Sequence, residues 1–154
     1  MPTSETNIIE IGCTPKALYE YVSQPWHWHE WHPSSRSAGS EASKLEVGDT
    51  FTEVIELQPF SPLPFRMRRQ TTYRVLVAEP EESWQVRGET RDGWLMIQYA
   101  FEPIEQGTRF TRTLTYEATG PTALLMPFLK KRMAEKSRIA LANLKRRMER
   151  TPDV

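Results

Sequence analysis

A long helical pattern at the C-terminal end constrains the fold more than any other feature of the sequence. After Gly120-Pro121, apolar and small side chains recur with the period of an α-helix. Those that gather on the side of Met133 are Met126, Leu129, Ser137, Ala140, Leu141, Leu144 and Met148. The pattern predicts one amphipathic helix of about 28 residues, long enough at about 1.5 Å per residue to span a domain. Such a helix needs tertiary packing for stability, so its apolar stripe must be buried against a sheet.

Residues 49–117 show the alternation of a β-sheet. Phe51, Ile55 and Leu57 alternate with polar neighbours, and further short runs follow, separated by turn signals at 80–82 and 105–107. No helical period intervenes between these runs. The region therefore predicts an antiparallel meander rather than a parallel sheet.

The N-terminal part of the chain predicts one strand, one short helix and a loop. Alternation over residues 8–13 indicates the strand. Thr14-Pro15 is a favourable helix start, and the helix is expected to end before Pro25. The run of small polar residues at 33–44 is expected to be an exposed loop.

Together these elements predict a single α+β domain covering residues 1–154. One sheet with an uncovered apolar face and one long helix bury each other when a curved antiparallel sheet, of about six to seven strands, wraps around the helix. A chain of 154 residues can form that core without disulfides or a structural metal. Where a curved sheet and a helix separate, the gap is a natural cavity for a ligand.

The charge balance and cysteine content exclude several classes of protein. Lys and Arg number 20, and so do Asp and Glu, so general electrostatic binding of nucleic acid is not expected. Cys13 is the only cysteine, which excludes an internal disulfide and favours a reducing compartment and a buried, unreactive thiol. The N-terminus lacks a signal-peptide pattern, and no apolar stretch approaches about 20 residues. We therefore expect a cytoplasmic protein without stable membrane insertion.

Several segments resemble the START-like (SRPBCC) superfamily and, within it, the polyketide cyclase/dehydrase and lipid transport group. IEIGCTPKALYEYVSQPWHWHEWHP resembles the group's opening strand, proline-started helix and aromatic segment. LEVGDTF resembles the entry to its second strand, and FEPIEQGTRFTRTLTYEATG the hairpin before its long helix. The resemblance covers nearly the whole chain and implies the helix-grip fold with a hydrophobic pocket. It does not imply one activity, because cyclases, lipid carriers, hormone receptors and chaperone activators share this fold.

The segment WHWHEWHP (26–33) holds three tryptophans and all three histidines of the chain. A zinc site needs three or four converging ligands, and on a helical turn His27 would point away from His29 and His32. We therefore favour an aromatic wall in which the tryptophans pack inward and the histidines sit in solvent. A lid whose residues touch a ligand is the alternative. No metal and no cofactor is expected.

Arg112 is the most informative charged residue. In RFTRTLTYE it shares one strand face with Phe110, Leu114 and Tyr116, which places a guanidinium among apolar side chains. A buried charge of this kind needs a carboxylate, water or an anionic ligand. Three alternatives stay open: an ion pair with Glu53, a ligand carboxylate or phosphate, or a bulge that turns the side chain outward.

The strand at 93–103 is expected to face the core with Leu95, Ile97, Tyr99 and Phe101. The Tyr99 phenol could then orient a ligand carbonyl or hydroxyl. The opposite face carries Trp94 and Met96, which would offer a surface for a homodimer unless the two faces are reversed.

The final helix carries nine basic residues between positions 130 and 150, against Glu135 and Glu149. A solvated helix face is favoured over binding of nucleic acid or an anionic membrane, because no aromatic residues are interleaved with these charges. Gly88 and Gly93 are interpreted as turn or bulge glycines, and the chain carries no phosphate-binding glycine loop.

The sequence thus predicts a protein that encloses a hydrophobic small molecule, lipid-like or aromatic, between sheet and helix. The predicted pocket residues are Trp28, Trp31, Tyr73, Tyr99, Arg112, Met133 and Ser137. One alternative is a cyclase or dehydratase acting on a polyketide-like substrate, although no acid–base pair is recognisable in the sequence. Another is an interaction module that uses the basic helix.

Overall fold

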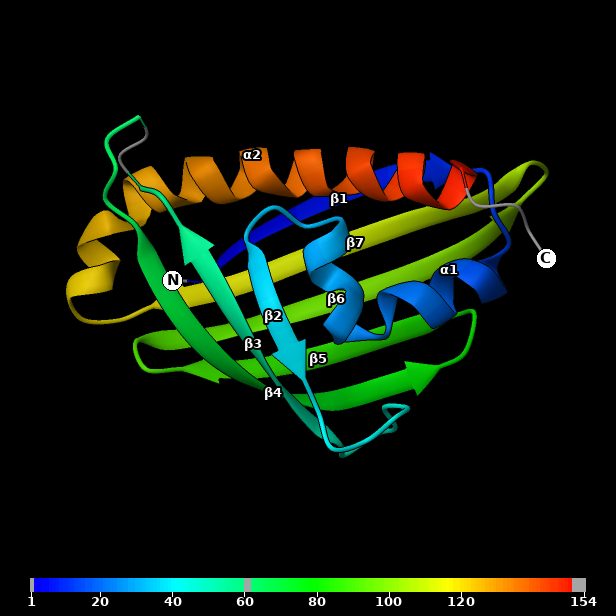
Figure 1. Cartoon of the computed structure of the whole chain (residues 1–154), viewed down its shortest axis with the longest axis horizontal. Coiled ribbons are helices and arrows are strands. Elements are labelled where there is room, and N and C mark those ends of the chain that lie inside the picture. Colours follow the sequence, from blue (N-terminus) through cyan, green and yellow to red (C-terminus); the bar gives the residue numbers. More distant parts are fainter. Residues whose placement is uncertain (1, 60–61, 151–154) are drawn as a thin grey trace.

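A seven-stranded antiparallel sheet curves around one long helix, as the sequence predicts (Figure 1). The computed structural model describes residues 2–59 and 62–150. The strands lie in the order β1-β7-β6-β5-β4-β3-β2. The elements in chain order are β1 (Thr3–Ile11), α1 (Pro15–Val22), the 3-10 helix η1 (Pro25–Glu30), β2 (Ser35–Gly39), β3 (Thr50–Leu57), β4 (Met67–Glu79), β5 (Ser83–Thr90), β6 (Gly93–Ile104), β7 (Gly107–Ala118) and α2 (Pro121–Arg150). This is the α+β helix-grip arrangement.

The short helix and the turns follow the local signals in the sequence. Thr14 caps α1, because its hydroxyl accepts a hydrogen bond from the backbone N–H of Ala17 at 3.1 Å. Helix α1 ends at Val22, three residues before Pro25. The predicted turns at 80–82 and 105–107 separate β4 from β5 and β6 from β7.

Two segments near the N-terminus differ from the prediction. The polar run at 33–44 contains strand β2, which pairs with β3 at one edge of the sheet. The side chains of β2 are mostly polar and exposed, and the strand pairs through backbone hydrogen bonds. The sequence of β2 therefore shows no alternation of apolar and polar residues from which a strand could be predicted. Strand β1 also begins earlier than expected, at Thr3, because it pairs with β7 along its whole length.

The apolar stripe of α2 packs on the concave face of the sheet (Figure 1). Leu129, Ala140, Leu141 and Leu144 are buried in α2, as the helical pattern predicts. Met126, Met133 and Met148 pack against the same core with part of their surface exposed. The C-terminal half of α2 is also tied to β1 and the loop after it: Lys145 Nζ donates to the carbonyl of Glu10 at 2.7 Å, and the N–H of Gly12 donates to Glu149 Oε2 at 2.8 Å. None of the described helices is both long and apolar enough to cross a membrane.

A matched pair of substitutions in α2 tests how the helix supports the core. Leu144→Ala empties a site in which the side chain is 0% exposed, whereas Ile139→Ala shortens a side chain that is 39% exposed. We expect Leu144→Ala to lower the free energy of unfolding by about 2–5 kcal/mol and Ile139→Ala by less than about 1 kcal/mol. Chemical denaturation measures both. Equal losses would mean that α2 presents a different face to the sheet.

Candidate functional site

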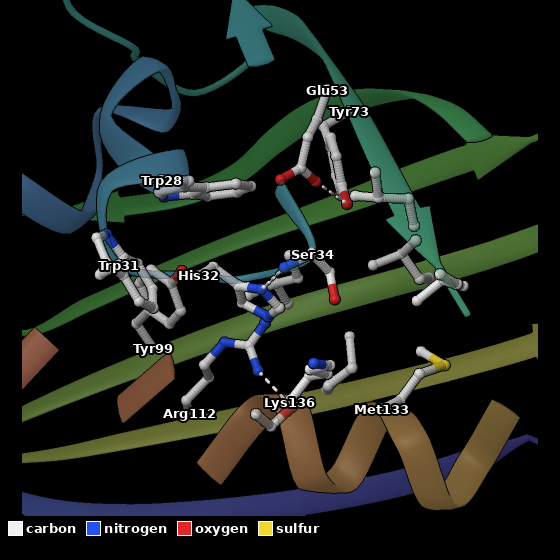
Figure 2. Close-up of a pocket in the computed structure, with 16 residues that line it drawn as sticks. Trp28, Trp31, His32, Ser34, Glu53, Tyr73, Tyr99, Arg112, Met133 and Lys136 are labelled. Carbon is white, nitrogen blue, oxygen red and sulfur yellow. Dashed lines mark hydrogen bonds between the residues drawn. The ribbon is translucent and has the colours of Figure 1, made fainter. Parts of the chain in front are cut away.

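A cavity lies between the sheet, the segment after η1 and the middle of α2 (Figure 2). The cavity has a volume of about 60 Å³, counted as the space open to the centre of a water molecule. This is several times the roughly 10–15 Å³ that one water molecule requires. Its apolar walls are Ile55, Leu57, Leu95, Ile97, Leu114 and Met133. Its aromatic walls are Trp28, Trp31, Tyr73 and Tyr99. Its polar lining is His32, Ser34, Glu53, Arg112, Lys136 and Ser137.

A second hollow adjoins the first toward the start of α2. It measures about 70 Å³ in the same way, and it shares Ile55, Leu57, Leu95 and Met133 with the first cavity. Met126 and Leu129 of α2 form its helix side. The four shared residues therefore form an apolar wall that runs from the first cavity into the second hollow.

Trp28 and Trp31 of WHWHEWHP form the aromatic end of the cavity, whereas Trp26 is partly buried against the core and does not line the cavity. The Trp28 ring meets Phe51, Tyr73 and Trp84 edge-on, with centroid distances of 5.5, 6.1 and 6.0 Å. Its Nε1–H donates to the carbonyl of Val22 at 2.8 Å, which fixes the ring after the end of α1. Trp31 is also buried, and its carbonyl accepts a hydrogen bond from Asn143 of α2. The prediction of an inward aromatic wall is correct for both residues.

The prediction that the histidines sit in solvent is wrong for His32. His29 is exposed, and His27 lies 3.3 Å from Glu30 near the surface, but the His32 ring lines the cavity. His32 Nδ1 accepts a hydrogen bond from the N–H of Ser34 at 3.1 Å. Burial, followed by the charges of Arg112 and Lys136, lowers the pKa of His32 to about 3, so the ring is neutral. Within residues 2–59 and 62–150, no three His, Cys, Asp or Glu side chains are grouped so that they could hold a metal ion.

Glu53 and Tyr73 form a buried pair at the sheet side of the cavity (Figure 2). Glu53 is 5% exposed, and the Tyr73 hydroxyl donates to its Oε1 at 3.2 Å. Burial raises the pKa of Glu53 to about 7, while the nearby Ser35 and Tyr73 hydroxyls and the Arg112 charge oppose the shift. A buried carboxyl group that exchanges its proton near neutral pH is therefore present in the cavity.

Gly88 sets the position of the Tyr73 ring, which corrects its interpretation as a turn or bulge glycine. Gly88 lies within β5, opposite Tyr73 of β4. A Cβ atom at position 88 would stand 2.7 Å from Cε1 of that ring and 2.5 Å from Cγ2 of Thr71. The ring thus occupies the space that any side chain at position 88 would need.

Arg112 points into the cavity from β7 and is 5% exposed. Its Nη1 donates to Ser137 Oγ of α2 at 3.1 Å, and the Ser137 hydroxyl donates in turn to Glu5 Oε1 of β1 at 2.6 Å. No ion pair joins Arg112 and Glu53, both of which lie in the described part of the chain, so the first of the three alternatives is not realised. The Nε atom of Arg112 is buried and has no hydrogen-bond partner among the described residues. The third alternative, an outward bulge, is also excluded.

All seven predicted pocket residues line this one cavity; whether they bind a ligand stays a prediction. Sequence reasoning missed His32 and Lys136, and it considered Glu53 only as a partner of Arg112. The shared strand face of Phe51, Glu53 and Ile55 was a signal for Glu53. No comparable signal exists for His32, because an irregular segment carries no face periodicity.

The two faces of β6 are oriented as predicted. Leu95, Ile97 and Tyr99 line the cavity, while Trp94 and Met96 lie on the outer face and are partly buried. The Arg87 guanidinium carbon lies 4.4 Å from the centroid of the Trp94 ring, which covers part of that face. A homodimer through this face stays a prediction.

Some of the basic residues of α2 are neutralised within the protein. Lys145 lies 2.7 Å from Glu149, Arg132 lies 3.3 Å from Glu135, and Arg147 lies 3.4 Å from Glu30. These pairs support the interpretation of α2 as a solvated helix face, and the expectation of no nucleic-acid partner stays a prediction.

Glu53 and His32 should give stability opposite dependences on pH. The raised pKa of Glu53 means that its contribution to stability is complete below its ordinary value of 4.5 and is lost as the pH rises through about 7. The lowered pKa of His32 means that its contribution is complete above its ordinary value of 6.5 and is lost as the pH falls toward about 3. Between pH 4.5 and 6.5 the two effects oppose each other. Each has a slope of at most about 1.4 kcal/mol per pH unit.

Two single variants should separate these slopes. Relative to the unaltered protein, Glu53→Gln should make stability rise with pH in this window, and His32→Asn should make it fall. Urea denaturation across the window measures both slopes, and the double variant serves as a control because it removes both effects. Single variants whose slopes match that of the unaltered protein would contradict the burial of these two groups.

Solved structures with the same fold resemble the chain closely in shape. A START superfamily protein from Mycobacterium smegmatis matches with a TM-score of 0.75 at 14% identity, over 96% of this chain and 97% of that one. A protein from Thermus thermophilus matches with a TM-score of 0.70 at 19% identity, over 96% and 97%. The di-domain ARO/CYC StfQ from the steffimycin biosynthetic pathway matches with a TM-score of 0.71 at 13% identity, over 97% of this chain and 51% of that one. At these identities the likeness shows the fold alone.

Sequence comparison assigns the family. No curated protein matches the chain. A family model described as polyketide cyclase / dehydrase and lipid transport matches residues 3–149, almost the whole chain. The chain therefore belongs to the polyketide cyclase/dehydrase and lipid transport family.

Proposed function

We propose that this protein binds one hydrophobic small molecule, lipid-like or polyketide-like, in the cavity between the sheet and α2. The observation that carries the proposal is a cavity with apolar and aromatic walls and a small set of polar groups in its lining. Ligand sites commonly combine these two features, since the walls supply affinity and the few polar groups fix orientation. The description of the family, which names polyketide cyclases and lipid transport, supports the same class of ligand.

The energetic cost of the cavity supports a binding role. Protein interiors are normally packed with few voids larger than a water molecule, and unfilled space in a core lowers stability. Here the void lies beside buried ionisable groups, Glu53 and Arg112, which are themselves costly to remove from water. Both costs are offset when a bound molecule fills the space and meets the polar groups.

A bulky side chain in the shared wall should block binding. Leu95 of β6 lines both hollows, whereas Leu76 of β4 is exposed and lines neither. We expect Leu95→Trp to weaken binding of the apolar dye 1-anilinonaphthalene-8-sulfonate at least about tenfold, a change of about 1.4 kcal/mol. Leu76→Trp, the matched control, should leave binding unchanged. A fluorescence titration measures both, and equal binding by both variants would place the dye site elsewhere.

A second candidate function is acid–base catalysis on a polyketide-like substrate. The specific observation is Glu53, a cavity carboxyl group with a pKa of about 7, which can donate or accept a proton at neutral pH. The Tyr73 hydroxyl donates to Glu53 Oε1 and so fixes the orientation of this carboxyl group. A similar fold occurs in StfQ, which is described as a di-domain ARO/CYC of the steffimycin biosynthetic pathway.

A Glu53 variant separates the two candidate functions. Under the binding function, Glu53→Gln should retain affinity for apolar ligands within about threefold, because the amide is isosteric and can still accept from Tyr73. Under the catalytic function, the unaltered protein should convert a short poly-β-ketone into a cyclic product with loss of one water, and Glu53→Gln should slow this by about 100-fold or more. Mass spectrometry follows the product. No conversion by the unaltered protein would leave binding alone.

A further inference from the structure

We propose that the ligand is an apolar monocarboxylate whose carboxylate group binds beside Arg112, His32 and Lys136, which line the cavity. This inference rests on the proposed binding function and specifies the chemical class of the ligand. The part of the cavity around these residues has three features: a buried donor without a partner, two lining cations, and an apolar wall that continues into the second hollow.

The first observation is the unused donor on Arg112. The guanidinium is buried, with one of its terminal nitrogens, Nη1, bound to Ser137. Its Nε, by contrast, has no hydrogen-bond partner among residues 2–59 and 62–150. A buried N–H without a partner carries a cost comparable to that of a lost hydrogen bond. An acceptor on the ligand, placed against this side of the guanidinium, would remove that cost.

His32 supplies a second donor in the same place. Because its Nδ1 accepts from the N–H of Ser34, the neutral ring carries its proton on Nε2. The Arg112 guanidinium and the His32 ring lie close together in the view of Figure 2, and the charge of Arg112 acts on His32. Two N–H groups therefore serve this part of the cavity, a pattern suited to the two oxygens of a carboxylate.

The charge balance also favours an anion. Two cations line the cavity, Arg112 of β7 and Lys136 of α2. Glu5 of β1 compensates one of them through the Ser137 hydroxyl. Glu53 of β3 has a pKa raised to about 7, so at and below neutral pH it carries only part of a charge. His32 is neutral, so at neutral pH part of one positive charge is left for the ligand to balance, and this surplus grows as the pH falls below about 7. One carboxylate supplies that charge, whereas a cation or a neutral amine would not.

The shape of the site sets the direction of the ligand. Ile55, Leu57, Leu95 and Met133 line both hollows and lead away from the polar groups. An apolar tail is therefore expected to run along this wall toward the start of α2, with the carboxylate beside Arg112.

The test compares decanoate with decanol, which share the tail and differ in the head group. Quenching or enhancement of tryptophan fluorescence reports binding, because Trp28 and Trp31 line the cavity. We expect the unaltered protein to bind decanoate at least about tenfold more tightly than decanol. Arg112→Met should weaken decanoate binding by roughly 10- to 100-fold, the range for a lost charge-assisted hydrogen bond, and leave decanol binding unchanged. Lys136→Met should act in the same direction with a smaller effect.

Lys131→Met is the matched control, because Lys131 is an exposed cation of the same helix and does not line the cavity. It should bind both ligands as the unaltered protein does. If Arg112→Met does not fold, Arg112→Lys keeps the charge but removes the Nε–H donor, and it should lose affinity for decanoate alone.

The outcomes separate this inference from the function on which it rests. Equal binding of decanoate and decanol, or equal losses for both ligands in Arg112→Met, would overturn the carboxylate site while leaving hydrophobic binding intact. Binding of neither ligand, together with dye binding that Leu95→Trp does not change, would overturn both proposals. Selective loss of decanoate binding in the Arg112 and Lys136 variants, with Lys131→Met unchanged, would support the carboxylate site.

Discussion

Burial of the apolar stripe of α2 against the curved sheet is the interaction on which the rest of the structure depends. Leu129 lies at one end of the stripe, and Leu141 and Leu144 lie toward the other, each of them almost fully buried. Between them the stripe thins to Met133 and Ser137, which line the cavity. A small hydroxyl at position 137 leaves room for the Arg112 side chain and also binds it. Helix α2 is therefore tightly packed against the core at both ends of its apolar stripe and lines the cavity in the middle.

The ionisable groups of the cavity are held apart instead of being paired. Glu53 bonds to Tyr73 on the sheet side, and Arg112 bonds through Ser137 to Glu5 near the edge strand β1. A direct ion pair between Glu53 and Arg112 would satisfy both charges and fill the space between them. Their separation keeps both groups available to a bound molecule. A buried carboxyl group with a raised pKa inside a cavity, as at Glu53, marks a candidate functional site.

Small local features position these groups. Gly88 gives the Tyr73 ring the space that a side chain would take, and the ring carries the hydroxyl to Glu53. The hydrogen bond from Trp28 to Val22 holds the turn after α1 against the sheet, which brings the following His32 into the cavity. The cavity thus depends in part on Gly88 and Val22, which do not line it.

Local periodicity in the sequence was enough to determine the long helix, the meander of strands, and the inward face that Arg112 shares with Leu114 and Tyr116. These features depend on neighbours along the chain, since a residue's face follows from its position within its own helix or strand. The partners of Arg112 and the place of His32 in the cavity wall were decided only by the tertiary structure. Ser137 and Glu5 lie 25 and 107 residues from Arg112 in the chain, in two other elements. Their meeting depends on how α2 crosses the sheet and on the register of β1 with β7, and no local pattern encodes such long-range geometry.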